Sequence, residues 1–426
     1  MNGQADFSEV LEVASEAGHI LLENGAEISR VEDIMNRIST HYGVSSGNFF
    51  VLSNGIFTTG RADKVTEGGG QASTYANVEF IPIRSPQLSR VSAVNRLSYD
   101  IAADRCTLEE AKRRLSAIRY SAPKPFWEQM LAMTVSSGAF AAIFGGSFAD
   151  CLAASIAGFL LFLFMYFVST PHLSRIVAGI CNATFVTVLC TLCWRFGLGE
   201  NLSNIVIGAI MPLVPGIAFV NGVRDLANSD YLAGLTRLTD AMLGFFCIAI
   251  GVALSFILDG GFFGGLIALG YTESSPQTAS LLCQALAALT GTAGFAVLFG
   301  VDREQYLGCG LIGMAGWLLY LVLFRYYGQS APIASLFASF LVCVLARCMA
   351  VRRRCPAQIF LICGIFPLVP GAGIFWFSYR LTLGSVAQSA TSGFVALKVA
   401  VCIVLGIILA MELPQRLFSG RRRRIH

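Results

Sequence analysis

Charged side chains are rare in the apolar part of this chain, and those beside its long apolar stretches are the candidates for chemistry. Five of them could couple or gate movement across a membrane: Asp225, Asp230, Arg237, Asp240 and Lys398. Lys398 falls within a stretch long enough to span a bilayer, where a charge is costly and by default functional. It lies about two turns from the outer end of that stretch, so its amine could equally reach the membrane surface.

Asp240 is the leading candidate, because it begins the predicted fifth span directly after a charged loop. A carboxylate that is withdrawn from water holds its proton more readily and could carry it across a membrane. The alternative is structural, because aspartate often caps the first turn of a helix. The other three, Asp225, Asp230 and Arg237, lie in the loop itself, where charges are usually solvated.

One pentapeptide occurs twice in the apolar part. Pro212-Leu213-Val214-Pro215-Gly216 recurs as Pro367-Leu368-Val369-Pro370-Gly371, each time in the middle of an apolar stretch. A proline within a helix removes a backbone donor and clashes with the preceding turn, so each stretch should break or kink. Interrupted segments at matching places in two halves are typical of the substrate pathway of a secondary transporter. Two kinked, tightly packed structural helices are the alternative.

The duplication extends well beyond the pentapeptide. The offset of 155 residues between Pro212 and Pro367 also aligns Ser136–Gly145 with Gly291–Gly300 and Ile210 with Ile365. Single matches between apolar segments arise easily by chance, but a constant register over four successive stretches does not. Two homologous halves are therefore predicted.

The composition indicates an integral membrane protein. Of the 426 residues, 55% are hydrophobic and 13% are charged, with a mean hydropathy of +0.66, whereas soluble domains carry about 25% charged residues. Half of the charges fall in residues 1–124, which hold 13 Lys/Arg and 15 Asp/Glu. That part should be soluble and nearly neutral, without a basic face for nucleic acid.

Several kinds of chemistry find no support in the sequence. The 13 cysteines are mostly scattered in apolar stretches and the four histidines show no ligand spacing, so no metal site and no cofactor are expected. Residues 1–124 contain no hydrolase or metalloprotease motif, which argues against an enzyme or sensor and leaves no catalytic residue to name. GxxxxGK[ST] does not occur, so an ion or proton gradient is expected to drive the protein.

The soluble part should be a small α/β domain. Apolar periodicity predicts a helix over 7–40 with a kink at Gly25, and two more helices over 88–102 and 108–118. Strand-like runs lie at 48–58 and 77–84, and the loop between them holds Gly68-Gly69-Gly70. Thr107 with Glu110 predicts a capping box at the last helix.

The fold class predicted for the whole chain is an α-helical polytopic membrane protein. Its ten predicted spans are 126–147, 149–169, 175–194, 202–220, 239–258, 279–299, 306–324, 331–347, 357–377 and 391–411. Residues 1–124 form the cytoplasmic domain, 125–260 the first five-helix repeat, and 261–426 the second repeat with a basic tail. The short apolar segment 260–271 is an outer loop or a re-entrant piece.

Arginine placement sets the orientation, because arginine-rich loops stay in the cytoplasm. One side carries Arg175, Arg224, Arg237, Arg303, Arg347, Arg352, Arg353, Arg354, Arg416 and Arg421 to Arg424, and the other only Arg195, Arg325 and Arg380. Both termini should then be cytoplasmic. Five spans per half is an odd number, so the two repeats should be inverted, as in an alternating-access carrier. A channel with two-fold pseudosymmetry is the alternative.

Three segments resemble the threonine/serine exporter family. Leu21–Asp33 and Arg90–Leu97 are similar to the soluble domain of that family, and Arg224–Asp240 to its segment between the fourth and fifth spans. The resemblance covers nearly the whole chain. It implies a cytoplasmic domain and two five-span modules, which some bacteria carry as two proteins, and export of small hydroxy amino acids driven by an ion gradient. Two-protein relatives are associated with dicarboxylate export.

The segment Leu21–Asp33 contains the motif residues Gly25, Glu27, Arg30 and Glu32. The three charged ones are near neighbours on one helical turn and could be a solvated ion-pair cluster. The alternative is a gating contact with the membrane part.

The sequence therefore predicts a proton- or ion-driven exporter, an antiporter of the cell inner membrane, with L-threonine and L-serine as leading substrates. A dicarboxylate exporter of the same architecture and a small-solute channel are the alternatives. The expected partners are the small-molecule substrate and the lipid bilayer, without nucleic acid, and a homo-oligomer is left open.

Overall fold

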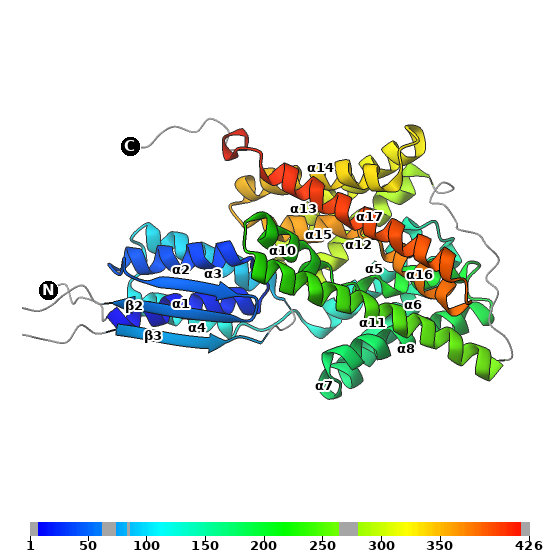
Figure 1. The fold of residues 1–426 in the computed structure, drawn as a ribbon, viewed down its shortest axis with the longest axis horizontal. Helices are drawn as coiled ribbons and strands as arrows, with labels where there is room; N and C mark the ends of the chain where they lie inside the picture. The colour runs from blue at the N-terminus through cyan, green and yellow to red at the C-terminus, as the bar shows by residue number, and fades with distance from the viewer. Residues whose placement is uncertain (1–6, 62–73, 83–85, 264–279, 419–426) are drawn as a thin grey trace, which may run out of the picture.

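The computed structural model describes residues 7–61, 74–82, 86–263 and 280–418. An N-terminal unit of helices and strands lies beside a larger bundle, in which the described residues form helices and their connections (Figure 1). The linker before Phe126 joins the two parts.

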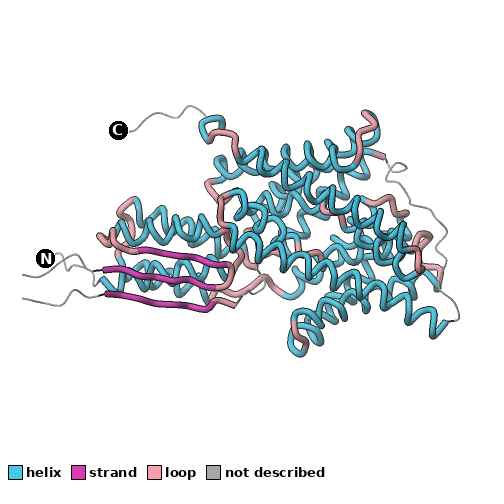
Figure 2. Tube along the Cα trace, in the orientation of Figure 1, coloured by secondary structure: helices cyan, strands magenta, loops and turns pink. Residues whose placement is uncertain are grey.

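The N-terminal unit packs helices against one face of a small sheet. The strands β1 (Asn48–Leu52), β2 (Gly55–Arg61) and β3 (Thr74–Phe80) are antiparallel in the order β1-β2-β3 (Figure 2). Most buried positions of β2 alternate with exposed ones, because one face of the strand meets the helices. The helices of this unit are α1 (Phe7–Glu23), α2 (Ile28–His41), α3 (Leu88–Ala102) and α4 (Leu108–Arg119), of which α1 packs on β2 and α2 on β1.

Two predictions for this unit need correction. The helix expected over 7–40 is two helices, because Gly25 adopts a φ of +81° that ends one helix and turns the chain before the next. The run 48–58 is a hairpin rather than one strand, since Leu52 pairs with Gly55 and the chain turns at the two residues between them. One bond of the predicted capping box of α4 is present, with the Glu110 amide donating to the Thr107 hydroxyl at 3.3 Å, while the Glu110 side chain pairs with Arg113 and Arg114. Gly68 to Gly70 lie outside the described residues.

The bundle begins with α5 and ends with α17. Its first half comprises α5 (Phe126–Ile143), α6 (Phe148–Phe164), α7 (Thr170–His172), α8 (Arg175–Arg195), α9 (Leu202–Ile210), α10 (Gly216–Ala227) and α11 (Tyr231–Phe263). Its second half comprises α12 (Leu281–Leu298), α13 (Tyr306–Leu321), α14 (Ala331–Arg353), α15 (Ala357–Ile365), α16 (Gly371–Thr382) and α17 (Val386–Met411).

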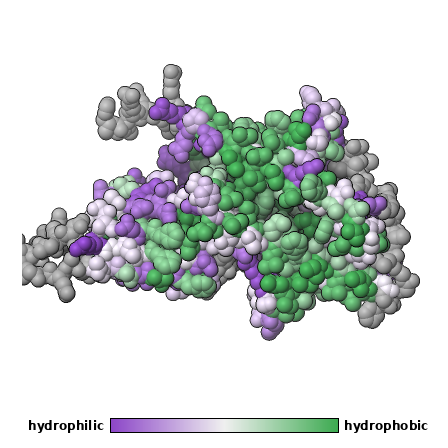
Figure 3. Space-filling view, in the orientation of Figure 1, coloured by the Kyte–Doolittle hydropathy of each residue, from purple (hydrophilic) through white to green (hydrophobic). Residues whose placement is uncertain are grey.

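The bundle has the helices of a multi-pass membrane protein. Within the described residues, seven helices are long and apolar enough to cross a membrane, or up to nine if each of two bent helix pairs counts as one span. The first predicted span, 126–147, corresponds to α5, which is not among these nine and carries Glu128 in its first turn. Apolar residues cover the visible face of the bundle, whereas polar ones gather on the N-terminal unit (Figure 3).

One span boundary and one loop differ from expectation. The fifth span was expected to begin at 239, but α11 already begins at Tyr231, so Asp240 lies inside the helix and does not cap it. The segment 260–271 falls mostly outside the described residues, since α11 runs to Phe263 and description resumes at 280.

The offset of 155 residues reappears in the helices themselves. Shifted by 155, the bounds of α5, α9 and α10 coincide with those of α12, α15 and α16. Left-handed backbone recurs at the same offset, at Gly145 and Gly300 and at Ser229 and Gly384. Helix packing also repeats, because α5 lies against α6 as α12 lies against α13, and α8 against α11 as α14 against α17.

The equivalent helices α5 and α12 contact each other and run antiparallel. Gln284, near the start of α12, donates to the carbonyl of Ala142 at the end of α5, at 3.0 Å. At the opposite end, Arg303 follows α12 and pairs with Glu128 near the start of α5. The rings of the equivalent residues Phe140 and Phe295 meet between them, 5.2 Å apart and edge to face.

Candidate functional site

Both proline pentapeptides break a helix, and they do so with the same backbone. After α9 and after α15 the chain makes one 3₁₀ turn, at Met211–Leu213 and at Phe366–Leu368. Val214 and Val369 are then extended, with φ and ψ of −65° and 127° and of −62° and 133°. A new helix starts directly after the second proline of each motif, bent by 59° in the first pair and 41° in the second. The predicted breaks are therefore present, at the predicted residues.

The two breaks pack against each other reciprocally. A Cβ added to Gly216 would lie 2.5 Å from Cζ of Phe366, and one added to Gly371 would lie 2.5 Å from Sδ of Met211. Met211 and Phe366 hold equivalent positions in the two halves, so each motif presses its glycine on the other. Phe366 also stacks on Phe295, with ring centroids 4.0 Å apart. Only glycine permits the two helix breaks to approach each other this closely.

A cavity of about 390 Å³ opens beside the first break. Pro215 and Gly216 line it together with Arg237 and Asp240 of α11, and Gly25 of the N-terminal unit closes part of it. The structure thus brings together at one cavity residues from all three predicted sets: the hinge, the gating charges and the motif of the soluble part.

The segment between α1 and α2 is docked on the bundle through its backbone. The carbonyl of Gly25 accepts from the side-chain amides of Asn221, at 2.7 Å, and Gln358. The carbonyl of Ala26 accepts from Arg237 at 2.8 Å. These contacts join α10, α11 and α15 to residues more than a hundred positions away in the chain.

Three ion pairs support the same segment. The amide of Ile28 donates to Asp225 at 3.1 Å, and the other oxygen of Asp225 accepts from Arg237 at 2.7 Å. Both of these side chains are buried, with Asp225 fully withdrawn from solvent. Arg224 lies 2.6 Å from Glu27, which also pairs with Arg30 at 3.2 Å.

Electrostatics keeps Glu27 ionised. Burial raises the pKa of Glu27, but the charges of Arg224, Arg30 and Arg237 together outweigh burial and hold that pKa below its ordinary value. The pairing is therefore a contact between charges, of the kind that loses much of its strength when either partner is neutralised.

The remaining predicted residues lie around or away from this cavity. Asp240 accepts from Arg175 at 3.3 Å, beside the cavity. Asp230 directly precedes α11, and burial raises its pKa. Glu32 turns toward the sheet, where it accepts from the amide of Val51 at 3.3 Å. Lys398 is on the exposed side of α17, with Nζ 5.4 Å from the ring centroid of Phe394.

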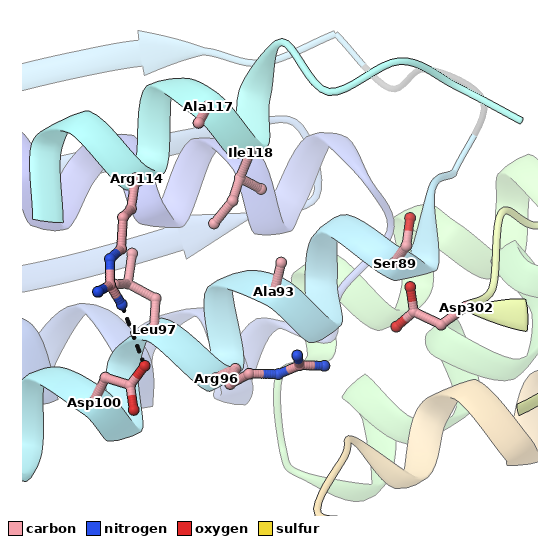
Figure 4. Close-up of a pocket in the computed structure, with 9 residues that line it drawn as sticks. All are labelled: Ser89, Ala93, Arg96, Leu97, Asp100, Arg114, Ala117, Ile118 and Asp302. Atoms are coloured by element: carbon pink, nitrogen blue, oxygen red, sulfur yellow. Dashed lines mark hydrogen bonds and ion pairs between the residues drawn. The ribbon is translucent and has the colours of Figure 1, made fainter. Parts of the chain in front are cut away.

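A second contact fixes the N-terminal unit to the bundle. The first two amides of α3, at Leu88 and Ser89, donate to the carbonyls of Phe299 and Gly300 just after α12, at 2.9 and 3.0 Å. Figure 4 shows the neighbouring pocket between α3 and α4, where Ser89 faces Asp302 from the bundle. Burial raises the pKa of Asp302. This pocket lies apart from the broken spans, and its far end is closed by the ion pair of Asp100 and Arg114 at 3.3 Å.

Three residues of the site are absent from the sequence-based candidates: Asn221, Arg224 and Gln358. Asn221 and Gln358 are polar side chains in broken apolar spans, and Arg224 stands at the end of one, which is itself a signal of function. In the structure all three are buried. Within the described residues, no three His, Cys, Asp or Glu side chains are arranged to hold a metal ion.

Comparison with known families matches two models to the chain. A family described as "Putative threonine/serine exporter" matches residues 12–258, and one described as "Threonine/Serine exporter, ThrE" matches residues 284–412. The two matches divide the chain between its two halves. No solved structure matches it.

Individual relatives carry similar names. A "Threonine/serine exporter" of Corynebacterium glutamicum is 24% identical over 98% of this chain and 85% of its own length. A "Probable threonine/serine exporter" of Mycobacterium tuberculosis is 25% identical over 79% of this chain, which spans 65% of that protein. A "Probable succinate transporter subunit YjjP" of Escherichia coli is 22% identical over 59% of this chain and 95% of its own length.

Proposed function

This chain belongs to the threonine/serine exporter family, and we propose that it exports small polar metabolites, with L-threonine and L-serine as leading substrates. The observation that carries the proposal is the cavity beside the first helix break, lined by polar residues of α10 and α11. Interrupted helices in a membrane are tolerated where they line a cavity and leave backbone groups for a solute.

We propose that the two halves are inverted repeats and work by alternating access. The antiparallel contact of α5 with α12 and the reciprocal packing of the two breaks support this reading. A solute site between such halves could open to either side as they rock against each other. In this scheme α5 also spans the membrane and brings the number of spans to ten, both termini are cytoplasmic and the protein resides in the inner membrane.

The orientation can be tested by cysteine labelling from outside. In a Cys-free background, a single cysteine is placed at Phe148 or at Asp302, which follow the ends of α5 and α12. The inverted scheme expects the cysteine at 148 to react with an impermeant reagent in intact cells and the one at 302 to react only after permeabilisation. Labelling of both from the same side would contradict the inversion.

Asp240 is proposed to couple export to the proton gradient. It lines the cavity and accepts a hydrogen bond from Arg175. Protonation of Asp240 would therefore release Arg175 and change the charge of the cavity lining. Asp240→Asn keeps the size of the side chain but cannot titrate. Cells preloaded with threonine-containing dipeptides should then lose uphill, protonophore-sensitive efflux while the variant inserts normally.

A matched control is Asp104→Asn, because Asp104 is exposed in the N-terminal unit, where it pairs with His41. Its efflux should equal that of the unmodified protein. Full efflux by Asp240→Asn with unchanged sensitivity to the protonophore would remove Asp240 from the mechanism.

A second variant, with both Pro212 and Pro215 replaced by alanine, should insert but export poorly, because the helix break would be lost.

Dicarboxylate export is the second candidate. The relative named as a succinate transporter subunit supports it, as do the two arginines that line the cavity, Arg175 and Arg237, which could face two carboxylates. Parallel measurement of succinate and threonine efflux decides between the two. A channel would release either solute only down its gradient, so efflux against a threonine gradient separates a carrier from a channel.

A further inference from the structure

We propose that residues 24–28 occupy the site at which the substrate binds from the cytoplasm, so that this segment, here called the plug, is a tethered competitor of a carboxylate-bearing solute. The inference rests on the proposed function, and it identifies where the solute is first held. The expected ligand class is a small molecule with one carboxylate and a second hydrogen-bonding group, as in an amino acid.

The bundle side of the plug contact is a built polar site. Its hydrogen-bonding side chains come from three helices, α10, α11 and α15, and each is at most 8% exposed: Asn221, Arg224, Asp225, Arg237 and Gln358. Burying so many polar groups is costly unless something satisfies them. The plug does so with two carbonyls, one amide and one carboxylate.

Arg224 is only partly satisfied by the plug. Its NH2 lies 2.6 Å from Glu27, but its Nε and NH1 are buried and have no hydrogen-bond partner among the described residues. An arginine can bind a carboxylate through two parallel bonds, whereas Glu27 meets Arg224 through one oxygen in an ion pair. The site is therefore better suited to a carboxylate that can approach Arg224 side-on than to the carboxylate that the chain itself supplies.

The plug presents the groups of an amino acid to the same partners. Glu27 gives Arg224 a carboxylate, and the amide of Ile28 gives Asp225 a donor, where an ammonium group could also bind. Without the plug, Arg224, Asp225 and Arg237 leave one net positive charge, which Glu27 neutralises. The N–H groups that Asn221 and Gln358 donate to Gly25 would then be available to a hydroxyl oxygen, while Gln358 also donates to Asn221 at 3.0 Å.

The plug can leave without releasing the whole N-terminal unit. Gly25 separates α1 from α2, and the bonds of α3 to the carbonyls after α12 are independent of the plug. A segment held this way rebinds at an effective concentration of about millimolar. A solute in the cytoplasm therefore competes with the plug. The apparent affinity of the solute is its intrinsic affinity multiplied by the fraction of time that the plug is undocked.

The test measures L-threonine binding by isothermal titration calorimetry to purified full-length protein in detergent. Glu27→Gln keeps the length of the side chain but removes the charge that Arg224 binds, so the plug should dock less tightly. We expect the apparent Kd for threonine to fall by up to about tenfold. Glu16→Gln is the matched control, because Glu16 pairs with Arg119 inside the N-terminal unit at 3.5 Å. It should leave the Kd unchanged.

Arg224→Gln gives the opposite expectation, loss of threonine binding, because it removes the group that holds the carboxylate. If that variant does not fold, as judged by size-exclusion chromatography, the pair Glu27→Gln and Glu16→Gln decides alone. If Glu27→Gln binds threonine with an unchanged or higher Kd, the plug proposal is overturned, while the proposed export function still stands. Failure of the unmodified protein to export threonine, serine or succinate from cells would instead overturn the proposed function.

Discussion

The two broken spans share a backbone but carry different chemistry at equivalent positions. After the first break come Asp225 and Arg237, an ion pair at 2.7 Å. At the equivalent positions after the second break stand Arg380 and Ser392, which also contact each other. The contact between the two positions is kept, but the groups that make it change from a carboxylate and a guanidinium to a guanidinium and a hydroxyl.

The environments of the two pairs differ just as much. The first pair holds a segment of the N-terminal unit, through Ile28 and Ala26. The second lies beside an aromatic cluster in which Tyr379 meets Phe256 and Phe375. Proline and glycine set the break itself, so the side chains after it were free to diverge. In an alternating carrier, that divergence would decide which end binds the solute and which end lets it go.

The largest effect should come from removing the cation of the first pair. Arg237→Ala leaves the carboxylate of Asp225 buried without its partner, which costs about 3–5 kcal/mol of unfolding free energy. Ser392→Ala removes only a hydroxyl that Arg380 contacts, and should cost about 1–2 kcal/mol. Chemical denaturation of the purified proteins in detergent measures both.

A double variant checks the cause of that difference. Adding Asp225→Asn to Arg237→Ala removes the unpaired charge and should recover part of the lost stability. If Arg237→Ala and Ser392→Ala lower the unfolding free energy equally, the pairs Asp225–Arg237 and Arg380–Ser392 stabilise the protein alike, and the contrast between them is wrong.

The next effect tests the reciprocal packing of the breaks. Gly216→Ala places a Cβ 2.5 Å from the ring of Phe366, which is itself stacked on Phe295, so it should cost about 1–3 kcal/mol. Gly371→Ala meets the sulfur of Met211 at the same distance, but a methionine adapts more easily. The second substitution should therefore cost less than the first in the same unfolding measurement.

Removing the ring of Phe366 is the control for the two glycine variants. Phe366→Leu combined with Gly216→Ala should be less unstable than the sum of the two single variants, because the clash is gone. Identical costs for the two glycine variants would show that the neighbours move equally easily.

Much of the fold could be predicted because local signals and the repeat agree. The spans follow from hydropathy, and the breaks follow from Pro212 and Pro367, whose effect on a helix is local. The hairpin at 53–54 was missed, because the run 48–58 is apolar at both ends, although Ser53-Asn54-Gly55 is a turn sequence. The start of α11 was also missed, because Gly234, Thr236 and Arg237 interrupt the apolar run, whereas in the structure the added turns pack against α10.

The docking of the plug could not be predicted from one sequence. The contact joins Gly25 to Gln358 and Ile28 to Asp225, residues far apart in the chain. Asp225 looks like a solvated loop charge in the sequence, but in the structure it is buried between Arg237 and the amide of Ile28. The motif Gly25, Glu27 and Arg30 was recognisable, but its partner surface was not.

A smaller effect separates docking from folding. Gly25→Ala must place a side chain at a φ of +81°, which costs about 1–2 kcal/mol, although its nearest neighbours at 3.6 Å leave room for a Cβ. Gly43→Ala is a close control, because Gly43 has a φ of +89° and open space around it. Both should lose similar stability, but only Gly25→Ala should change export. Unchanged efflux in both would make the position of Gly25 structural only.

The smallest effect is the pH dependence of the plug, which should be absent near neutrality. Because the pKa of Glu27 is lowered on docking from the value of 4.5 for a free side chain, the carboxylate favours docking only while it is ionised. Its contribution is fully present above 4.5 and is lost as the pH falls through the lowered pKa. Hydrogen exchange of residues 24–28, corrected for the intrinsic effect of pH, should show constant protection between pH 7 and about 5.5, and loss only in stronger acid. Glu27→Gln should lack that acid transition. Protection that already disappeared between pH 7 and 6 would point to a group with a raised pKa instead, such as Asp230, whose charged form burial disfavours.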